Sequence, residues 1–339
     1  MTVLNHPDGD CRIEPLNGSL KRVTVQPTNP NLFVSRRSIV TSYPVGLIRD
    51  ILAIKGPGYV CDEIARDEDP NYVRFALETD LSAYLSAQQF AGKRILDFGC
   101  GSGASTMVLS RLYPDAEIVG IELDPKLLSI AKARARHYGF PEERLLLSPD
   151  GSEVPPGIGS FDCVLMSAVF EHLLPAERQI VLPKLWSLVV PGGYLFLNQT
   201  PHRFTPVETH TTGLPLINYL PDAVTHWAAC RFSRRLGRDE SWATLLRKGI
   251  RGGTEYEVQR ILRKASASYE PVLLPPTGNG LRDRIDLWAV ASMNSRLPAL
   301  KRVLKLTYKT IKFATGLTLV PSLSLAIQKR PVAGPSRDR

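Results

Sequence analysis

The segment Arg94–Thr106, with the sequence RILDFGCGSGAST, decides the fold of this chain. A short apolar run leads into a turn with glycine at positions 99, 101 and 103, and a helical pattern follows. Glycines let a ligand approach the backbone, and the N-terminus of the next helix offers it unpaired N–H groups. The spacing also fits the looser dinucleotide fingerprint G-x-G-x-x-A, so the class of ligand stays open at this point.

The residues after this turn alternate between strand and helix patterns. Apolar runs typical of strands occupy 117–123, 144–148, 161–167 and 191–200, and helical patterns separate them. Such alternation predicts an α/β protein with a Rossmann-like, doubly wound parallel sheet. Residues 201–310 break the alternation, and the pattern Ser-Leu-Ser-Leu at 322–325 predicts a strand that returns to the sheet.

Composition narrows the classes of protein that fit the sequence. The 339 residues are 43% hydrophobic and 22% charged, which is typical of a globular protein with a sizeable core. Five scattered cysteines form no C-x-x-C pair and the N-terminus has no apolar stretch, so we expect a cytoplasmic protein without a signal peptide. No run approaches the roughly 18 apolar residues of a membrane span, and no pattern indicates an oligomeric state.

Acidic residues follow three of the predicted strands and help to choose the ligand. Asp97 lies two residues before Gly99, where a carboxylate would repel a pyrophosphate but attract an ammonium group. Glu122 ends the second strand, where a carboxylate can accept both hydroxyls of a ribose. Asp150 follows the third strand and suits the amine of an adenine. The set favours a phosphate-free adenosine ligand over a dinucleotide.

This constellation resembles the class I S-adenosylmethionine-dependent methyltransferases, small-molecule branch. The matching segments are ILDFGCGSG, VGIELDP, SPDG, GSFDCVLMSAVFEHL and LVVPGGYLFLNQTP, in the order of the family and within residues 93–201. The resemblance implies a seven-stranded sheet with an antiparallel last strand and S-adenosyl-L-methionine as the cofactor. It assigns to the cofactor a set of eleven residues: Asp97, Gly99, Cys100, Gly101, Gly103, Glu122, Leu123, Asp150, Gly151, Ser167 and Ala168.

The resemblance also divides the chain. We expect a loosely structured N-terminal segment at 1–40, a helical cover at 41–92 and the S-adenosylmethionine-binding core at 93–200. A helical insertion that forms a substrate lid is expected at 201–310, before a closing strand of the core within 311–330 and a disordered tail at 331–339.

The place after the fourth strand indicates which atom is methylated. Many enzymes that methylate the amines of nucleic-acid bases carry an N/D-P-P-Y/F turn there, but this chain has Ser-Ala-Val-Phe at 167–170. The sequence therefore favours O-methylation of a small molecule, with C-methylation as an alternative. A general base helps when the acceptor is a hydroxyl. The candidates are His172, His202 and His210, the last two flanking Glu208. We expect no metal, since their spacing matches no standard ligand pattern.

Charge is distributed unevenly and suggests an anionic partner. Residues 1–201 contain 19 Lys and Arg against 23 Asp and Glu, whereas residues 202–339 contain 23 against 10. Within 296–313, six basic residues accompany an apolar helical stripe, and no acid in that stretch opposes them. Such a helix suits peripheral contact with an anionic membrane or with a lipid- or phosphate-bearing acceptor. A nucleic-acid methyltransferase and a non-catalytic adenosine-binding protein are the alternative functions.

Overall fold

The computed structural model describes residues 1–29, 32–151, 153–292 and 298–332. The expected tail at 333–339 and the start of the basic stretch, 296–297, lie outside the described residues. The chain forms two compact units, one from Met1–Glu78 with Gly99–Pro149 and the other from Thr79–Phe98 with Asp150–Arg339. Helix α3 (Phe75–Ser82) contains the point where the chain passes from one unit to the other.

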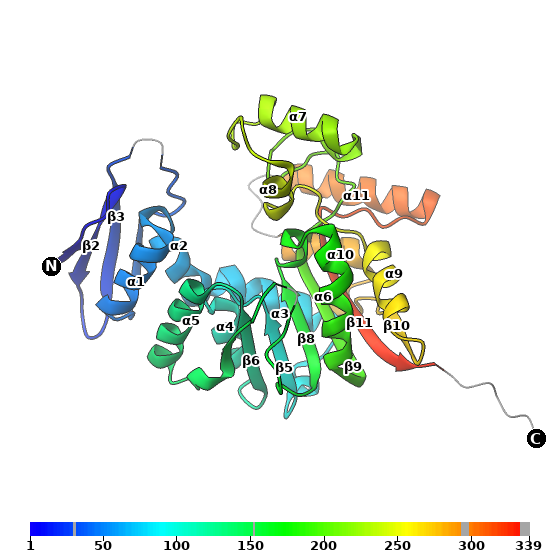
Figure 1. The fold of residues 1–339 in the computed structure, drawn as a ribbon, viewed down its shortest axis with the longest axis horizontal. Helices are drawn as coiled ribbons and strands as arrows, with labels where there is room; N and C mark the ends of the chain where they lie inside the picture. The colour runs from blue at the N-terminus through cyan, green and yellow to red at the C-terminus, as the bar shows by residue number, and fades with distance from the viewer. Residues whose placement is uncertain (30–31, 152, 293–297, 333–339) are drawn as a thin grey trace, which may run out of the picture. The chain divides into compact units, whose positions relative to one another are not determined.

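The first unit contains a small antiparallel sheet of four strands in sequential order (Figure 1). The strands are β1 (Thr2–Leu4), β2 (Gly9–Pro15), β3 (Lys21–Pro27) and β4 (Ser38–Thr41). Alternating side chains of β2 and β3, such as Cys11, Ile13, Val23 and Val25, are buried against the two following helices. The expectation of loose structure over 1–40 is therefore wrong. Turns rich in Pro, Asn and Gly separate these strands. The sequence-based expectation followed these turn residues and missed the alternation of buried and exposed side chains in β2 and β3.

Helices and two further strands complete the first unit. They are α1 (Val45–Lys55), α2 (Pro57–Glu68), α4 (Ala104–Leu112), β6 (Glu117–Glu122), α5 (Pro125–Tyr138) and β7 (Leu145–Leu147), with short turns η1 (Pro70–Arg74) and η3 (Glu142–Arg144). Helix α1 buries Leu47, Ile48, Ile51 and Leu52, the stripe that its helical spacing predicts. Strands β6 and β7 pair in parallel.

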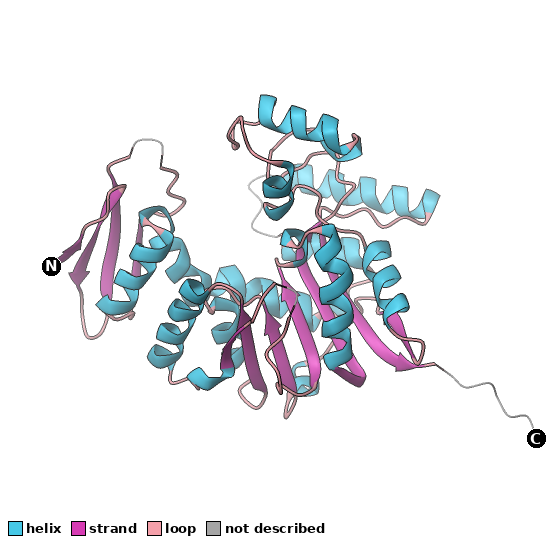
Figure 2. Cartoon of the chain, viewed as in Figure 1, coloured by secondary structure: helices cyan, strands magenta, loops and turns pink. Residues whose placement is uncertain are grey.

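The second unit contains the remaining strands of the large sheet and the C-terminal helices (Figure 2). Its elements are η2 (Ala87–Phe90), β5 (Arg94–Phe98), β8 (Phe161–Ser167), η4 (Phe170–His172), α6 (Pro175–Leu188), β9 (Val189–Pro201), η5 (Ile217–Tyr219), α7 (Asp222–Phe232), α8 (Trp242–Arg247), α9 (Glu255–Ala265), β10 (Tyr269–Leu273), η6 (Gly278–Gly280), α10 (Arg284–Ala291), α11 (Pro298–Thr315) and β11 (Ser322–Pro331). Helix α6 continues through Pro183, as its apolar spacing predicts.

The large sheet has seven strands in the order β10-β11-β9-β8-β5-β6-β7. The β5–β8 and β8–β9 pairs are parallel, and β11 runs antiparallel to both β9 and β10. The Rossmann-like, doubly wound seven-stranded sheet with an antiparallel last strand is confirmed. The segment predicted as an insertion also supplies β10, an edge strand whose residues Tyr269–Leu273 carry too little alternation to stand out.

Candidate cofactor and acceptor site

The glycine turn after β5 is held by the backbone of the neighbouring strand β6. The N–H groups of Gly99 and Cys100 both donate to the carbonyl oxygen of Ile121, at 2.9 Å each. Gly99, Gly101 and Gly103 have φ values of +74°, +57° and +84°, a region that side chains other than glycine rarely adopt. The turn therefore requires its glycines, and the predicted strand–turn–helix context is present.

Glu122 closes this turn from the carboxyl end of β6. Its Oε2 accepts from the N–H of Gly101 at 2.7 Å, and its Oε1 accepts from the N–H of Asp124 at 2.9 Å. The next residue, Leu123, leaves 51% of its surface exposed at the same strand end. A fixed carboxylate beside an uncovered apolar side chain is an arrangement that suits a ribose and the base attached to it.

A buried cluster of Arg134, Glu63 and Ser102 also holds this turn in place. Arg134 of α5 is fully buried and donates through Nη1 to the carbonyl oxygen of Ser102 at 2.8 Å and through Nη2 to Glu63 Oε2 at 3.0 Å. The Ser102 hydroxyl donates to the same carboxylate oxygen at 2.5 Å. Burial alone would raise the pKa of Glu63, but Arg134, Lys55 and Ser102 together hold it at about 2.

Sequence reasoning missed this cluster, although a signal was available. Arg134 occupies a position four residues after Ile130, on the buried stripe of α5, and Glu63 lies between Val60 and Ile64 on the buried stripe of α2. A charged residue on an apolar stripe is almost never fully buried without a partner. Two residues of opposite charge on apolar stripes, such as Arg134 and Glu63, therefore predict a buried ion pair between them.

The predicted acidic residues of the second unit differ in environment. Asp97 is 2% exposed, one residue before the end of strand β5, so its carboxylate is shielded from bulk water. Asp150 and Gly151 lie in a turn, and Asp150 is exposed. The contacts that the resemblance implies for these three residues stay predictions.

Buried polar atoms without partners mark the ends of β8 and β9. Ser167 Oγ and both side-chain polar atoms of Asn198 have no hydrogen-bond partner among the residues that the structure describes. The two residues pair across the strands, and the N–H of Ala168 donates to the carbonyl oxygen of Asn198 at 2.9 Å. Ala168 and Gln199 both have positive φ, +54° and +59°. Unsatisfied polar groups and backbone strain at adjacent strand ends indicate a place built for a ligand.

The structure brings together two of the three histidines predicted as general bases. One ligand atom from each of Glu171, His172 and His210 lies within 4.8 Å of the others. His172 Nδ1 lies 2.7 Å from the carbonyl oxygen of Arg247, and since a carbonyl only accepts, Nδ1 carries the proton. Glu171 Oε2 accepts from the hydroxyl of Thr200 at 3.0 Å. Burial raises the pKa of Glu171. His210 is exposed on one side, and the partial burial of its ring together with the nearby His172 lowers its pKa.

Glu208 has a structural role in the loop that carries His210. One of its oxygens accepts from the N–H groups of His210 and Thr211 at 2.9 Å each, and the other accepts from the N–H and hydroxyl of Thr212 at 2.6 and 2.7 Å. The hydroxyl of Thr211 then donates to the carbonyl oxygen of Lys248 at 2.8 Å. The buried carboxylate thus fixes the position of His210 rather than facing an acceptor.

His202 lies apart from this cluster. It is 6% exposed, and its Nδ1 accepts from the N–H of Phe204 at 3.1 Å. Burial, with a smaller effect of Arg284, lowers its pKa to about 4, so its ring is neutral at neutral pH. Its predicted catalytic role stays a prediction.

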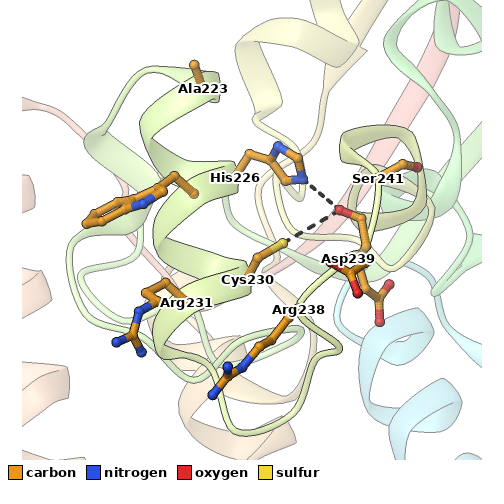
Figure 3. A pocket seen from close by; sticks show the side chains of 9 residues that line it. Ala223, His226, Cys230, Arg231, Arg238, Asp239 and Ser241 are labelled. Carbon is orange, nitrogen blue, oxygen red and sulfur yellow. Dashed lines mark hydrogen bonds between the residues drawn. The ribbon is translucent and has the colours of Figure 1, made fainter.

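An open pocket of about 610 Å³ lies between α7 and the loop that leads to α8 (Figure 3). His226 and Cys230 of α7 both contact the carbonyl oxygen of Glu240, at 2.6 and 3.6 Å, which ties the loop to the helix. Arg231 and Arg238 supply two guanidinium groups to the lining. The opposite end of α8 packs against η4, the turn that carries His172.

Each unit, taken by itself, contains residues that suit a part of the cofactor that the resemblance implies. A Cβ atom at Gly101 would meet no atom of the described residues within 4 Å, so the turn leaves an open face. In the first unit, Glu122 supplies a carboxylate at that turn. In the second unit, the hydroxyl of Ser167 at the end of β8 has no hydrogen-bond partner among the described residues. This donor set is acidic and neutral, which suits an adenosine with an amino-acid end and disfavours a pyrophosphate.

Comparison with known proteins gives the family of the central segment. Residues 96–195 match the family model described as a methyltransferase domain. The chain is 33% identical over 115 residues to the demethylmenaquinone methyltransferase of Thermus thermophilus, covering 34% of this chain and 50% of the relative. It is 33% identical over 127 residues to a ubiquinone biosynthesis O-methyltransferase of Xanthomonas euvesicatoria, covering 36% and 50%. The chain thus spans about half the length of the curated relatives that it matches.

Among solved structures, the S-adenosylmethionine-bound amino pentose methyltransferase CalS10 of Micromonospora echinaspora is 29% identical with a TM-score of 0.30. That match covers 38% of this chain and 50% of the other. The sequence match spans the glycine turn, Glu122 and strands β6 to β8. Residues 96–195 are therefore a class I S-adenosylmethionine-dependent methyltransferase domain, and S-adenosyl-L-methionine is its cofactor.

Proposed function

We propose that the whole chain transfers a methyl group from S-adenosylmethionine to a hydroxyl oxygen of a small molecule. The observation that carries the proposal is a cluster of Glu171 and His172, which follow β8 of the methyltransferase domain, with His210 from the loop after β9. The cofactor supplies an activated methyl group, so the chain has to position an acceptor oxygen and exclude water.

Three features support an oxygen rather than an amine as the acceptor atom. The segment Ser167–Phe170 has no proline and so lacks the N/D-P-P-Y/F turn that many methyltransferases of nucleic-acid base amines carry. His172 presents Nε2 with a free lone pair, because Nδ1 carries the proton. One of the curated relatives is named as an O-methyltransferase. The imidazoles are suited to contact an acceptor hydroxyl and to help remove its proton.

The segment 201–310 is proposed to bind the acceptor, as the predicted lid. Its pocket at α7 is lined by Arg231 and Arg238 as well as by Asp239 and Glu240. The two guanidinium groups are the part of this lining that would bind a phosphate-bearing acceptor. The chemistry of the two guanidinium groups is the basis of this part of the proposal.

The experiment uses S-adenosylmethionine with a deuterated methyl group and a metabolite extract from cells. We expect mass spectrometry to find a labelled methyl ether with the wild-type chain and none with Glu122→Ala, which removes the carboxylate at the glycine turn. Label on nitrogen atoms, on nucleic acid, or on nothing at all would contradict the proposal.

Helix α11 is proposed to contact an anionic membrane surface. Leu306 and Phe313 are 69% and 94% exposed on it, although Lys305, Lys309 and Lys312 form ion pairs with Asp283 and Asp286 at the start of α10. The ion pairs reduce the charge that the sequence alone suggested, so the apolar side chains provide the larger part of the expected affinity. Among the described residues, no helix combines the length and apolarity of a membrane crossing.

Co-sedimentation with vesicles tests this contact. We expect binding to phosphatidylserine-containing vesicles that falls at least fivefold in the double variant Leu306→Ser and Phe313→Ser. The matched control is Tyr256→Ser, which removes a side chain that is 70% exposed on α9. Equal binding by all three chains would exclude α11 as the contact surface.

A further inference from the structure

One carboxylate oxygen of Glu171 is buried without a hydrogen-bond partner among the described residues. Its side chain is 0% exposed, and Oε1 has no hydrogen-bond partner among the described residues, whereas Oε2 is occupied by Thr200. The free oxygen faces the imidazole of His172, with 3.9 Å between Oε1 and Nε2. A buried carboxylate oxygen without a partner costs stability, and the distance to Nε2 is too long for a hydrogen bond.

His172 is held in the orientation and protonation state of a metal ligand. The bond from Nδ1–H to the carbonyl oxygen of Arg247 fixes the ring and leaves Nε2 with its lone pair. Histidines that bind metals nearly always donate their other ring N–H to a carbonyl or carboxylate in this way. Nε2 and Glu171 Oε1 lie at a separation that one ion with bonds of about 2.0–2.2 Å to each can bridge.

His210 reaches the same point because Gly249 has no side chain. A Cβ atom at Gly249 would lie 2.8 Å from His210 Cδ2, 2.9 Å from His210 Nε2 and 3.2 Å from Glu171 Cγ. The His172 and His210 rings are 5.6 Å apart between centroids and inclined at 48°, so they converge without stacking. The loop that carries His210 is fixed by Glu208, as described above.

We propose that Glu171, His172 and His210 bind one divalent transition-metal ion, a site of two imidazoles and one carboxylate. This ligand set suits Zn²⁺, Fe²⁺ or Mn²⁺ and leaves further coordination positions open. His210 is exposed, so those positions are accessible from solvent. With the ion bound, the lone pair of His172 Nε2 is taken up by the metal, so the acceptor hydroxyl contacts the ion rather than the imidazole. This consequence rests on the proposed function: the acceptor oxygen occupies an open coordination position, where the ion lowers the pKa of its hydroxyl. From the sequence, no metal was expected, because the spacing of the histidines around Glu208 matches no standard ligand pattern. Glu171 lies outside that set.

Calorimetric titration of the chelator-treated full-length chain with Zn²⁺, and separately with Mn²⁺, tests the site. We expect binding of one ion per chain by the wild type, and at least tenfold weaker binding by His210→Ala and by Glu171→Gln. His210 is exposed, so its truncation leaves folding intact. The matched control is His6→Ala, since His6 also lies beside a carboxylate, 3.8 Å from Asp8. This control keeps the wild-type affinity.

Two results overturn the metal site: no binding of either ion by the wild type, or affinities that both site variants retain. Cobalt provides a second readout, because Co²⁺ in such a site gives visible absorption bands that His210→Ala removes. Binding of S-adenosylhomocysteine is measured in parallel. A chain that binds S-adenosylhomocysteine but no metal ion refutes the metal site alone, whereas the reverse result refutes the proposed methyl transfer alone.

Discussion

The buried pair of Arg134 and Glu63 makes the sharpest prediction about stability. Replacing Arg134 with alanine leaves the Glu63 carboxylate 3% exposed and without its main counter-charge. The pKa of Glu63, about 2 against an ordinary 4.5, corresponds to about 3 kcal/mol of favourable interaction with the charged form. Breaking a buried ion pair from one side costs about 3–5 kcal/mol. We therefore expect Arg134→Ala to lower the free energy of unfolding by about 3–5 kcal/mol.

Arg136→Ala is the matched control on the same helix. Arg136 is 60% exposed and pairs with Glu142 at 2.6 Å, so its loss costs about 1 kcal/mol or less. Urea unfolding followed by circular dichroism measures both variants. The argument is refuted if the two variants lose the same stability.

The pH dependence gives this prediction a second test. The pKa of Glu63 is depressed in the folded chain, so its stabilising contribution is complete above pH 4.5 and is lost as the pH falls toward 2. Without Arg134, the buried carboxylate of Glu63 is unfavourable in its charged form, so its protonation at low pH reduces the loss of stability in the variant. The gap in stability between wild type and Arg134→Ala therefore narrows between neutral pH and about pH 3. A gap that stays constant would show that the charge of Glu63 is not the cause.

Three further predictions follow from single residues. Glu122→Ala removes the acceptor of the Gly101 N–H and should weaken S-adenosylhomocysteine binding at least tenfold in calorimetry, an expected loss of about 1.5–3 kcal/mol for a charged hydrogen bond; unchanged affinity would exclude its role. Gly103→Ala places a Cβ atom 2.7 Å from α5 at a φ of +84°, so its melting temperature should fall clearly below that of the wild type. Burial raises the pKa of Asp80 to about 7, so wild-type stability is lost as the pH rises from 3.8 through 7. Asp80→Asn should remove that loss, so that its melting temperature changes less between pH 5 and pH 8 than that of the wild type. An equal change in both chains would contradict this prediction.

The sequence was sufficient for the parts of the fold that local patterns define. Gly99, Gly101 and Gly103 require positive φ, and apolar runs such as 161–167 coincide with a strand, so the core of the sheet was predictable from residues alone. The strands of the N-terminal sheet were not, because the Pro, Asn and Gly residues in the turns between them obscure the alternation of buried and exposed side chains.

The candidate site divides in the same way. Glu122 ends a strand and could be assigned from its position. Glu171, in contrast, gains its significance from Thr200, His210 and Gly249, which are distant in sequence. No local pattern brings these four residues together. Glu208, which looked equally functional, caps its own loop through hydrogen bonds to residues two to four positions later in the chain.

The position of β11 constrains the order in which the large sheet can fold. This strand ends the described chain, yet it lies between β9 and β10, both synthesised earlier (Figure 1). While the ribosome still holds Ser322–Pro331, the facing edges of β9 and β10 have unpaired backbone groups, the kind of edge that invites association with other chains. Once β11 has been added, the hydroxyl of Ser324 donates to buried Asp80, a residue synthesised 244 positions earlier. Truncation before β11 should therefore yield an aggregating chain rather than a smaller working one.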